Sequence, residues 1–112
     1  MSHQPINFLR LYRKRSPITQ ADIAYLMNMP DYSSISRCEK GQRTPSVELL
    51  LVYHHIFATS VESFFEPHSQ IILSSLLERI GQLVGDIQKG ESDSKNLSRV
   101  KFLEEAIIRL TK

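Results

Sequence analysis

A short turn that cannot be helical lies between two stretches of helical pattern, and it constrains the fold more than any other feature. The turn is Asn28-Met29-Pro30-Asp31. Proline has no backbone N–H and cannot continue a helix, whereas asparagine accepts the left-handed backbone conformation that often ends one. We therefore predict one helix before the turn and a second helix after it, with a change of direction between them.

The helix before the turn is predicted over residues 20–27. Thr19 precedes it and Asp22 follows three positions later, a spacing at which each side chain satisfies an unpaired backbone N–H of the first turn. The apolar residues recur at one-turn spacings, which indicates a single buried face. They are Ile23, Ala24, Leu26 and Met27.

The helix after the turn is predicted over residues 32–40, with Asp31 as its cap. Ile35 is expected to face inward together with Cys38 or Glu39. The remaining side chains are polar or basic and suit a helix that enters the major groove of DNA, because a guanidinium can pair with both acceptors of guanine. The alternative is a solvated face on an ordinary small helix. The outward residues are Tyr32, Ser33, Ser36, Arg37 and Lys40.

Basic side chains are concentrated around these two helices. The net charge is only +2. Between residues 7 and 43, however, basic residues outnumber acidic ones, and between residues 44 and 66 every charged residue is acidic. Releasing counterions from DNA phosphates would give such a surface affinity for DNA of any sequence, although a run of charge is also compatible with an ordinary solvated surface. The basic residues are Arg10, Arg13, Lys14, Arg15, Arg37, Lys40 and Arg43.

The two helices and their flanks resemble the helix-turn-helix of the phage-repressor family, the Cro-like or Xre-type transcriptional regulators. The resemblance rests on Q-x-x-I-A-x-x-M from Gln20 and on S-x-I-S-R-x-E-x-G ending at Gly41, and it covers residues 7–67. The turn is one residue longer than in most of the family, which affects the positions of Tyr32 and Ser33 relative to the bases. Further matches are Leu9, Tyr12 and Arg13 before the motif, Arg43, Pro45, Ser46 and residues 47–50 after it, and residues 60–65.

The resemblance implies a five-helix repressor-like DNA-binding domain at residues 1–67. Together with a helical hairpin at residues 68–112, which the apolar pattern described below predicts, the chain is expected to be all-α. The resemblance also implies that Arg13 pairs with Glu39 as a structural brace and does not contact DNA. The implied base contacts are Tyr32, Ser33, Ser36 and Arg37. The implied phosphate contacts are Gln20, Lys40 and Arg43; the alternative for Gln20 is an exposed polar residue beside a cap.

Three further helices complete the predicted first domain. In residues 7–15, Phe8, Leu11 and Tyr12 form the apolar side. Residues 47–57 are apolar on nearly every side, which predicts a central buried helix. Ser60 caps a last short helix, and Pro67 marks the end of the domain.

Beyond Pro67, apolar residues recur in alternating steps of three and four, the seam of two packed helices, with a turn at residues 90–95. A hairpin of this kind is too thin to bury its own apolar stripes, so it packs either on a second copy or on its own N-terminal domain. We favour the homodimer, because the family binds two-fold-related half-sites. The seam residues are Leu73, Leu76, Ile80, Leu83, Ile87, Val100, Leu103, Ile107 and Leu110.

Several classes of protein are not expected. No apolar run approaches the ~20 residues that cross a bilayer, and the first residues lack the apolar core of a signal peptide, so we expect a cytoplasmic protein without a membrane partner. A single cysteine excludes an internal disulfide, and Cys38 is expected to pack as a small apolar side chain. No nucleophile–base pair or cluster of metal ligands occurs, so we expect no enzyme, no metal and no cofactor.

Two functional classes remain. The first is a sequence-specific DNA-binding transcriptional regulator, a homodimer whose partner is double-stranded DNA. The second is an antitoxin-like or co-regulator module whose hairpin binds another protein. The sequence does not define the operator, the regulated genes, or whether binding represses or activates transcription.

Overall fold

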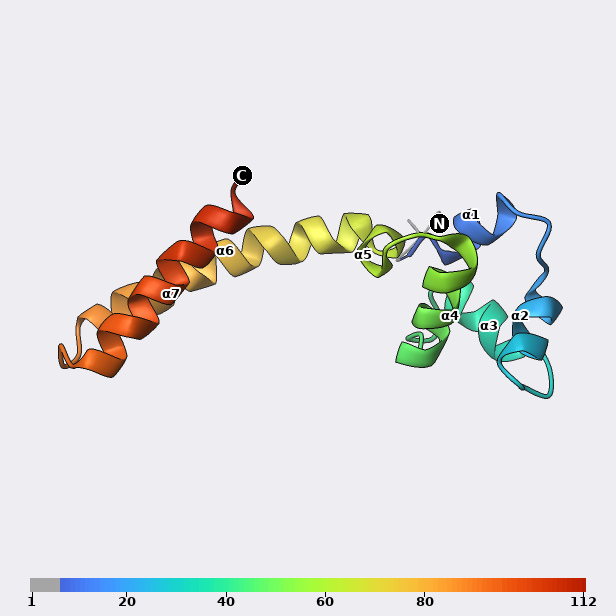
Figure 1. Cartoon of the computed structure of the whole chain (residues 1–112), viewed down its shortest axis with the longest axis horizontal. Helices are drawn as coiled ribbons and strands as arrows, with labels where there is room; N and C mark the ends of the chain where they lie inside the picture. Colours follow the sequence, from blue (N-terminus) through green and yellow to red (C-terminus); the bar gives the residue numbers. More distant parts are fainter. Residues whose placement is uncertain (1–6) are drawn as a thin grey trace. The chain divides into compact units, whose positions relative to one another are not determined.

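The computed structural model describes residues 7–112, and in that range it contains seven helices and no strand, so the prediction of an all-α chain is confirmed. Residues 1–6 of the predicted first domain lie outside the described part. The chain divides into two compact units, of which the first ends at Ser69 and the second is Gln70–Lys112. The helices, labelled in Figure 1, are α1 (Leu9–Lys14), α2 (Gln20–Leu26), α3 (Ser33–Glu39), α4 (Val47–Phe57), α5 (Val61–Phe64), α6 (Glu66–Gln88) and α7 (Ser94–Leu110).

Helix α1 buries a different leucine from the one expected. Leu9 is fully buried and Leu11 is 43% exposed, so the prediction that Leu11 lies on the buried side is wrong. The helix also starts later than predicted, because Asn7 lies before it and uses its side chain to bond to backbone groups. Oδ1 of Asn7 accepts from the backbone N–H of Leu9 at 3.0 Å, and Nδ2 donates to the backbone oxygen of Cys38 at 3.0 Å. These two bonds tie the start of α1 to α3 and place Leu9 in the core.

Helix α2 begins as the sequence predicts. The hydroxyl of Thr19 accepts from the backbone N–H of Asp22 at 3.0 Å, and the Asp22 carboxylate accepts from the backbone N–H of Thr19 at 3.0 Å. A cap of this kind stabilises a helix by about 1 kcal/mol. The helix ends at Leu26, and Asn28 has a positive φ of 56°, which confirms the left-handed residue expected before the turn.

Helix α4 has the predicted bounds, but it is not buried on every side. Leu49 and Tyr53 are buried, whereas Val47 is 72% exposed and Leu51 and Ile56 are also exposed. The prediction of a central buried helix therefore holds for one face of α4 and is wrong for the opposite face. A unit of this size has too little interior to enclose a helix, so one face packs inward and the other stays at the surface.

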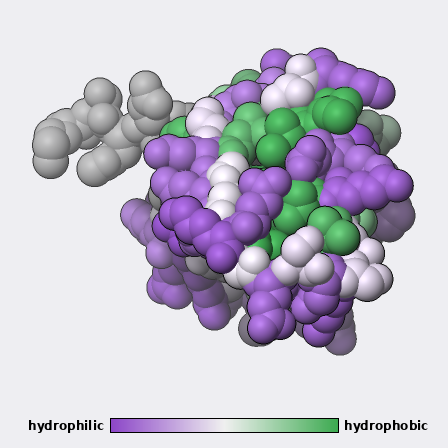
Figure 2. All heavy atoms as spheres, turned by 90° about the vertical axis from the view of Figure 1, so that its left-hand side faces the viewer, coloured by the Kyte–Doolittle hydropathy of each residue, from purple (hydrophilic) through white to green (hydrophobic). Residues whose placement is uncertain are grey.

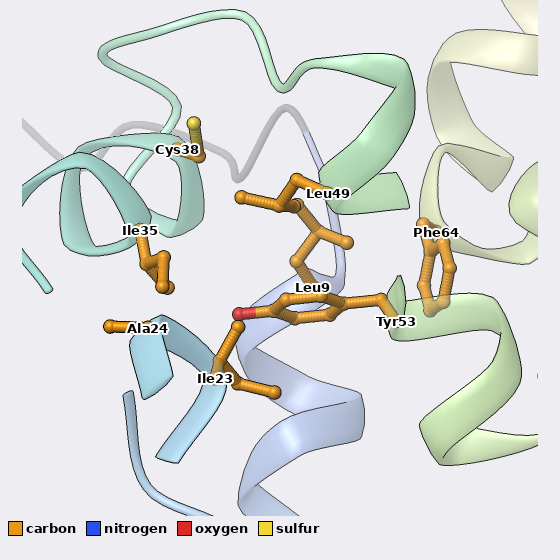
Figure 3. Packing of buried hydrophobic residues seen from close by; sticks show 8 residues of the cluster. All are labelled: Leu9, Ile23, Ala24, Ile35, Cys38, Leu49, Tyr53 and Phe64. Carbon is orange, nitrogen blue, oxygen red and sulfur yellow. The ribbon is translucent and has the colours of Figure 1, made fainter. Parts of the chain in front are cut away.

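One cluster of apolar side chains forms the core of the first unit, and every helix from α1 to α5 contributes to it. Figure 3 shows Tyr53 in the middle of the cluster, with its hydroxyl pointing toward the side where Ala24 and Ile35 lie. The rings of Tyr53 and Phe64 meet edge to face, with their centroids 6.1 Å apart. The cluster consists of Leu9, Ile23, Ala24, Ile35, Cys38, Leu49, Tyr53 and Phe64.

A left-handed residue joins α4 to α5. Ala58 has a φ of 50°, and the hydroxyl of Ser60 then caps α5 by accepting from the backbone N–H of Ser63 at 3.3 Å. Phe64 is fully buried, which confirms that this short helix closes the core. Pro67 does not interrupt helical structure: it lies in the first turn of α6, where a missing N–H has no intrahelical partner to lose.

Helices α6 and α7 of the second unit pack as a hairpin, with α7 beside the second half of α6 in Figure 1. Ile80 of α6 and Val100 of α7 are buried. The turn is shorter than the predicted residues 90–95, because the Asp93 carboxylate accepts from the backbone N–H of Asn96 at 2.8 Å and caps α7 at that point. None of the helices in residues 7–112 combines the length and apolarity needed to cross a membrane.

Candidate nucleic-acid interface

Helix α3 is fixed at both ends by local conformations. Asn28 and Gly41 both have positive φ, at 56° and 76°. The Asp31 carboxylate accepts from the hydroxyl of Ser33 and, at 2.9 Å, from its backbone N–H, and these bonds lower the pKa of Asp31. The helix therefore runs from Ser33 to Glu39, one residue shorter at each end than predicted.

One side of α3 is buried and the other is exposed. The inward residues are Ile35, Cys38 and Glu39, so both alternatives that the sequence left for the inner face, Cys38 and Glu39, are buried. On the other side Tyr32 is 51% exposed, and only one predicted outward residue, Ser36, is partly buried. The exposed members of that set are Tyr32, Ser33, Arg37 and Lys40.

Arg13 of α1 and Glu39 of α3 form a buried, two-pronged ion pair. Nε of Arg13 donates to Oε2 of Glu39 at 2.7 Å, and Nη2 donates to Oε1 at 2.9 Å. Nη1 donates to the backbone oxygen of Ile18 at 3.3 Å. The hydrogen bond to Glu39 raises the pKa of Arg13. The guanidinium of Arg13 thus spends these hydrogen-bond donors on groups of the protein itself, and it connects α1 to α3.

Glu39 accepts hydrogen bonds from two further side chains. The hydroxyl of Tyr53 donates to Oε2 at 2.6 Å, and the amide of Gln20 donates to Oε1 at 3.0 Å. Burial pushes the pKa of Glu39 upward, but the bonds from Arg13, Tyr53 and Gln20 outweigh it and hold this pKa below its ordinary value. Burial, followed by the bond to Glu39, raises the pKa of Tyr53. One carboxylate thus connects α1, α2, α3 and α4.

The side chains expected to contact phosphates lie around α3 in different settings. Lys40 is exposed just after the helix. Arg43 is exposed, and its Nη1 donates to Oγ of Ser34 at 2.8 Å, which leaves further N–H groups of the guanidinium for an anion. Gln20 is half-buried, and its amide has a second N–H besides the one that donates to Glu39. Ser34, which is not among the predicted site residues, accepts the bond from Arg43.

Two polar side chains outside the predicted set of site residues help to position α3. Tyr53 lies in the largely apolar stretch of residues 47–57. A buried tyrosine hydroxyl needs a hydrogen-bond partner, so a tyrosine in such a stretch is a signal for one. Asn7 bonds to the backbone of Cys38, which lies 31 positions away in the sequence. No local pattern reveals a partner at that separation.

Cys38 packs as an apolar side chain in the core of the first unit. It is buried, and burial raises the pKa of its thiol. A thiol is a poorer nucleophile than a thiolate, so burial disfavours the reactive form of this residue.

In the second unit, the residues expected to mediate dimerisation differ in exposure. Ile80 and Val100 are buried within the unit. Leu73, Ile87, Leu103 and Ile107 are partly buried. The exposed members are Leu76, Leu83 and Leu110.

Apolar side chains outside the predicted seam are exposed as well. Phe102 is 63% exposed, and Ile71 and Leu97 are also exposed. Figure 2, which views the structure toward the turn of the hairpin, shows apolar side chains gathered in a strip between polar ones. The hairpin carries a groove of about 570 Å³. This hairpin groove is lined by Leu83, Lys95, Ser98, Arg99, Phe102 and Leu103.

Comparison with protein-family models, with curated proteins and with solved structures finds no match for this chain.

Proposed function

We propose that this protein is a sequence-specific DNA-binding transcriptional regulator that places α3 in the major groove. The observation that carries the proposal is the division of α3 into two sides. Its inner side is anchored through Glu39 to three other helices, whereas its outer side presents Tyr32, Ser33 and Arg37 to solvent. A helix held rigidly from behind, with polar side chains in front, suits contact with base edges.

Each outer side chain has a separate role in this proposal. Arg37 pairs with the O6 and N7 acceptors of a guanine, and Tyr32, Ser33 and Ser36 bond to neighbouring base edges. Gln20, Lys40 and Arg43 bind phosphates and set the register of α3 without reading sequence. Helices α1 to α5 are, in the same proposal, a repressor-like domain of the kind that the sequence resembles.

The hairpin of α6 and α7 is proposed to join two copies of the chain. The apolar side chains that it leaves exposed, among them Leu76, Leu83 and Phe102, are what a self-complementary interface would cover. A homodimer carries two copies of α3, which bind half-sites about one helical turn of DNA apart. The expected operator is therefore two-fold symmetric.

The test is selection of bound duplexes from a random oligonucleotide pool with the full chain. We expect enrichment of a two-fold-symmetric sequence whose binding weakens steeply as salt rises. Failure to enrich any sequence, together with equal affinity for all duplexes, would contradict sequence-specific binding.

A second candidate is an interaction module of the antitoxin or co-regulator type, whose hairpin binds a different polypeptide. Exposed apolar side chains on the hairpin favour it, because large apolar patches mark sites of protein association. The purified protein distinguishes the two. A symmetric dimer with salt-sensitive DNA binding supports the regulator, whereas a monomer that exposes its apolar hairpin supports the interaction module.

A further inference from the structure

A basic groove lies between α1 and the start of α2, beside the N-terminal end of α3. Its volume is about 380 Å³. Two of its lining residues, Gln20 and Tyr32, are already proposed DNA contacts, so the groove is continuous with the proposed interface. The lining residues are Arg10, Arg13, Lys14, Thr19, Gln20, Ala21 and Tyr32.

The charge of this groove comes from two side chains of α1. Arg10 and Lys14 are exposed, and neither forms an ion pair within the described part of the chain. Arg13 also lines the groove, but Glu39 neutralises it. The lining contains no acidic side chain. The groove therefore carries positive charge that no acidic side chain of its lining cancels.

The positions of Arg10 and Lys14 suit a chain of phosphates. They are four residues apart on α1, which puts them one turn apart on the same face of the helix. Both are exposed and form no buried cradle of the type that holds a single small anion. Exposed cations spaced along an open groove match the repeating charge of a nucleic-acid strand.

We propose that the phosphodiester backbone of duplex DNA runs through this groove, where Arg10 and Lys14 bind phosphates next to the half-site that α3 contacts. This inference rests on the proposed DNA-binding function and adds a second line of backbone contact, on α1. In the sequence both residues belonged to a basic surface with general affinity for DNA, and neither was assigned a phosphate contact. Each contact acts by counterion release and contributes affinity without base preference.

The experiment compares the full-length protein with the double variant Arg10→Ala/Lys14→Ala. The control is Lys89→Ala/Lys112→Ala, which removes the same charge from exposed positions in the second unit. Affinity for the selected duplex and for a scrambled duplex is measured over a range of salt concentrations. Urea unfolding checks that each variant is folded.

We expect the slope of log affinity against log salt to fall by about 4 when the groove variant binds the selected duplex as a dimer, because two phosphate contacts are lost in each of the two half-sites and each contributes about one unit. Affinity for both duplexes should fall by the same factor, and the control variant should keep the wild-type slope. Ethylation interference should show two phosphates per half-site that matter for the wild type but not for the groove variant.

The outcomes separate this inference from the proposed function. A wild-type protein without DNA affinity would contradict the function itself. Normal wild-type binding with an unchanged slope in the groove variant would overturn only the inference. Competition by inorganic phosphate at constant ionic strength would also overturn it, because the groove would then hold a small anion.

Discussion

The hydroxyl of Tyr53 on α4 lies 2.6 Å from Oε2 of Glu39 on α3 and donates a hydrogen bond to it. The same oxygen accepts from Nε of Arg13 at 2.7 Å. In a buried setting, hydrogen bonds of this kind strengthen one another, and the loss of one partner is costly. The orientation of α3 is therefore set from the side opposite to its exposed face.

Arg13→Ala is expected to lower the free energy of unfolding by about 3–5 kcal/mol, because it leaves the buried charge of Glu39 without its main partner. Urea unfolding at neutral pH measures this loss. Lys14→Ala, an exposed neighbour, should change the stability by less than about 0.5 kcal/mol. Removing both charges together, in Arg13→Met/Glu39→Gln, should cost less than Arg13→Ala alone. If the double variant lost as much stability as Arg13→Met and Glu39→Gln lose separately when added together, the two side chains would not be coupled.

The stability of the first unit should fall in acid through Glu39. The pKa of this residue is lower in the folded protein than its ordinary value of 4.5. On acidification the unfolded chain therefore binds a proton first. The stabilisation is complete above that ordinary value and is lost as the pH falls through the folded pKa. Urea midpoints from about pH 6 to about pH 3 should drop less steeply in Glu39→Gln than in the wild type. An identical drop in both proteins would mean that Glu39 does not contribute to the loss of stability in acid.

Arg37→Ala should relax the preference for one base pair in each half-site, by about 1–3 kcal/mol, without unfolding the protein. Arg43→Ala is the matched comparison, since it should weaken binding to all sequences alike and lower the salt slope by about 1 for each half-site. Affinities for a panel of single-base operator variants measure both effects. An equal loss on selected and random DNA for Arg37→Ala would assign that side chain to phosphate.

Leu83→Glu should dissociate the proposed dimer while the helices remain folded. Leu83 is 42% exposed and lines the hairpin groove, so a carboxylate at this position becomes buried only in an assembly. Burying an unpaired charge costs more than 1.4 kcal/mol, which raises the dissociation constant at least about tenfold. Gln82→Glu adds the same charge at the neighbouring exposed position and should leave the mass unchanged in sedimentation analysis. A wild-type chain that sediments as a monomer would contradict the dimer.

Local signals in the sequence predicted much of the first unit. The cap formed by Thr19 and Asp22, the left-handed Asn28 and the bounds of α4 depend on contacts within a few residues, so the pattern contains the information. The sequence also placed the buried side of α3 correctly. The resemblance implied that Arg13 pairs with Glu39, and the structure brings these two side chains together.

Contacts between distant segments could not be predicted in this way. Leu9 replaces Leu11 in the core because the distant contact of Asn7 with α3 sets the start of α1. The network around Glu39 draws its partners from three other helices, and only the pair with Arg13 had a counterpart in the resemblance. Val47 on α4 is exposed because the first unit is too small to bury both faces of this helix. The apolar pattern within the helix does not show how large the surrounding unit is.

Ala58 keeps a φ of 50° at the end of α4, in a region of backbone space that glycine enters without the steric penalty of a Cβ atom. The folded protein therefore bears a steric cost at Ala58 that a glycine would remove. Ala58→Gly should raise the melting temperature by a few degrees, as expected for a gain of up to about 1 kcal/mol in a domain of this size. Differential scanning calorimetry measures the shift, and a lower melting temperature would mean that the methyl group packs better than its backbone strain suggests.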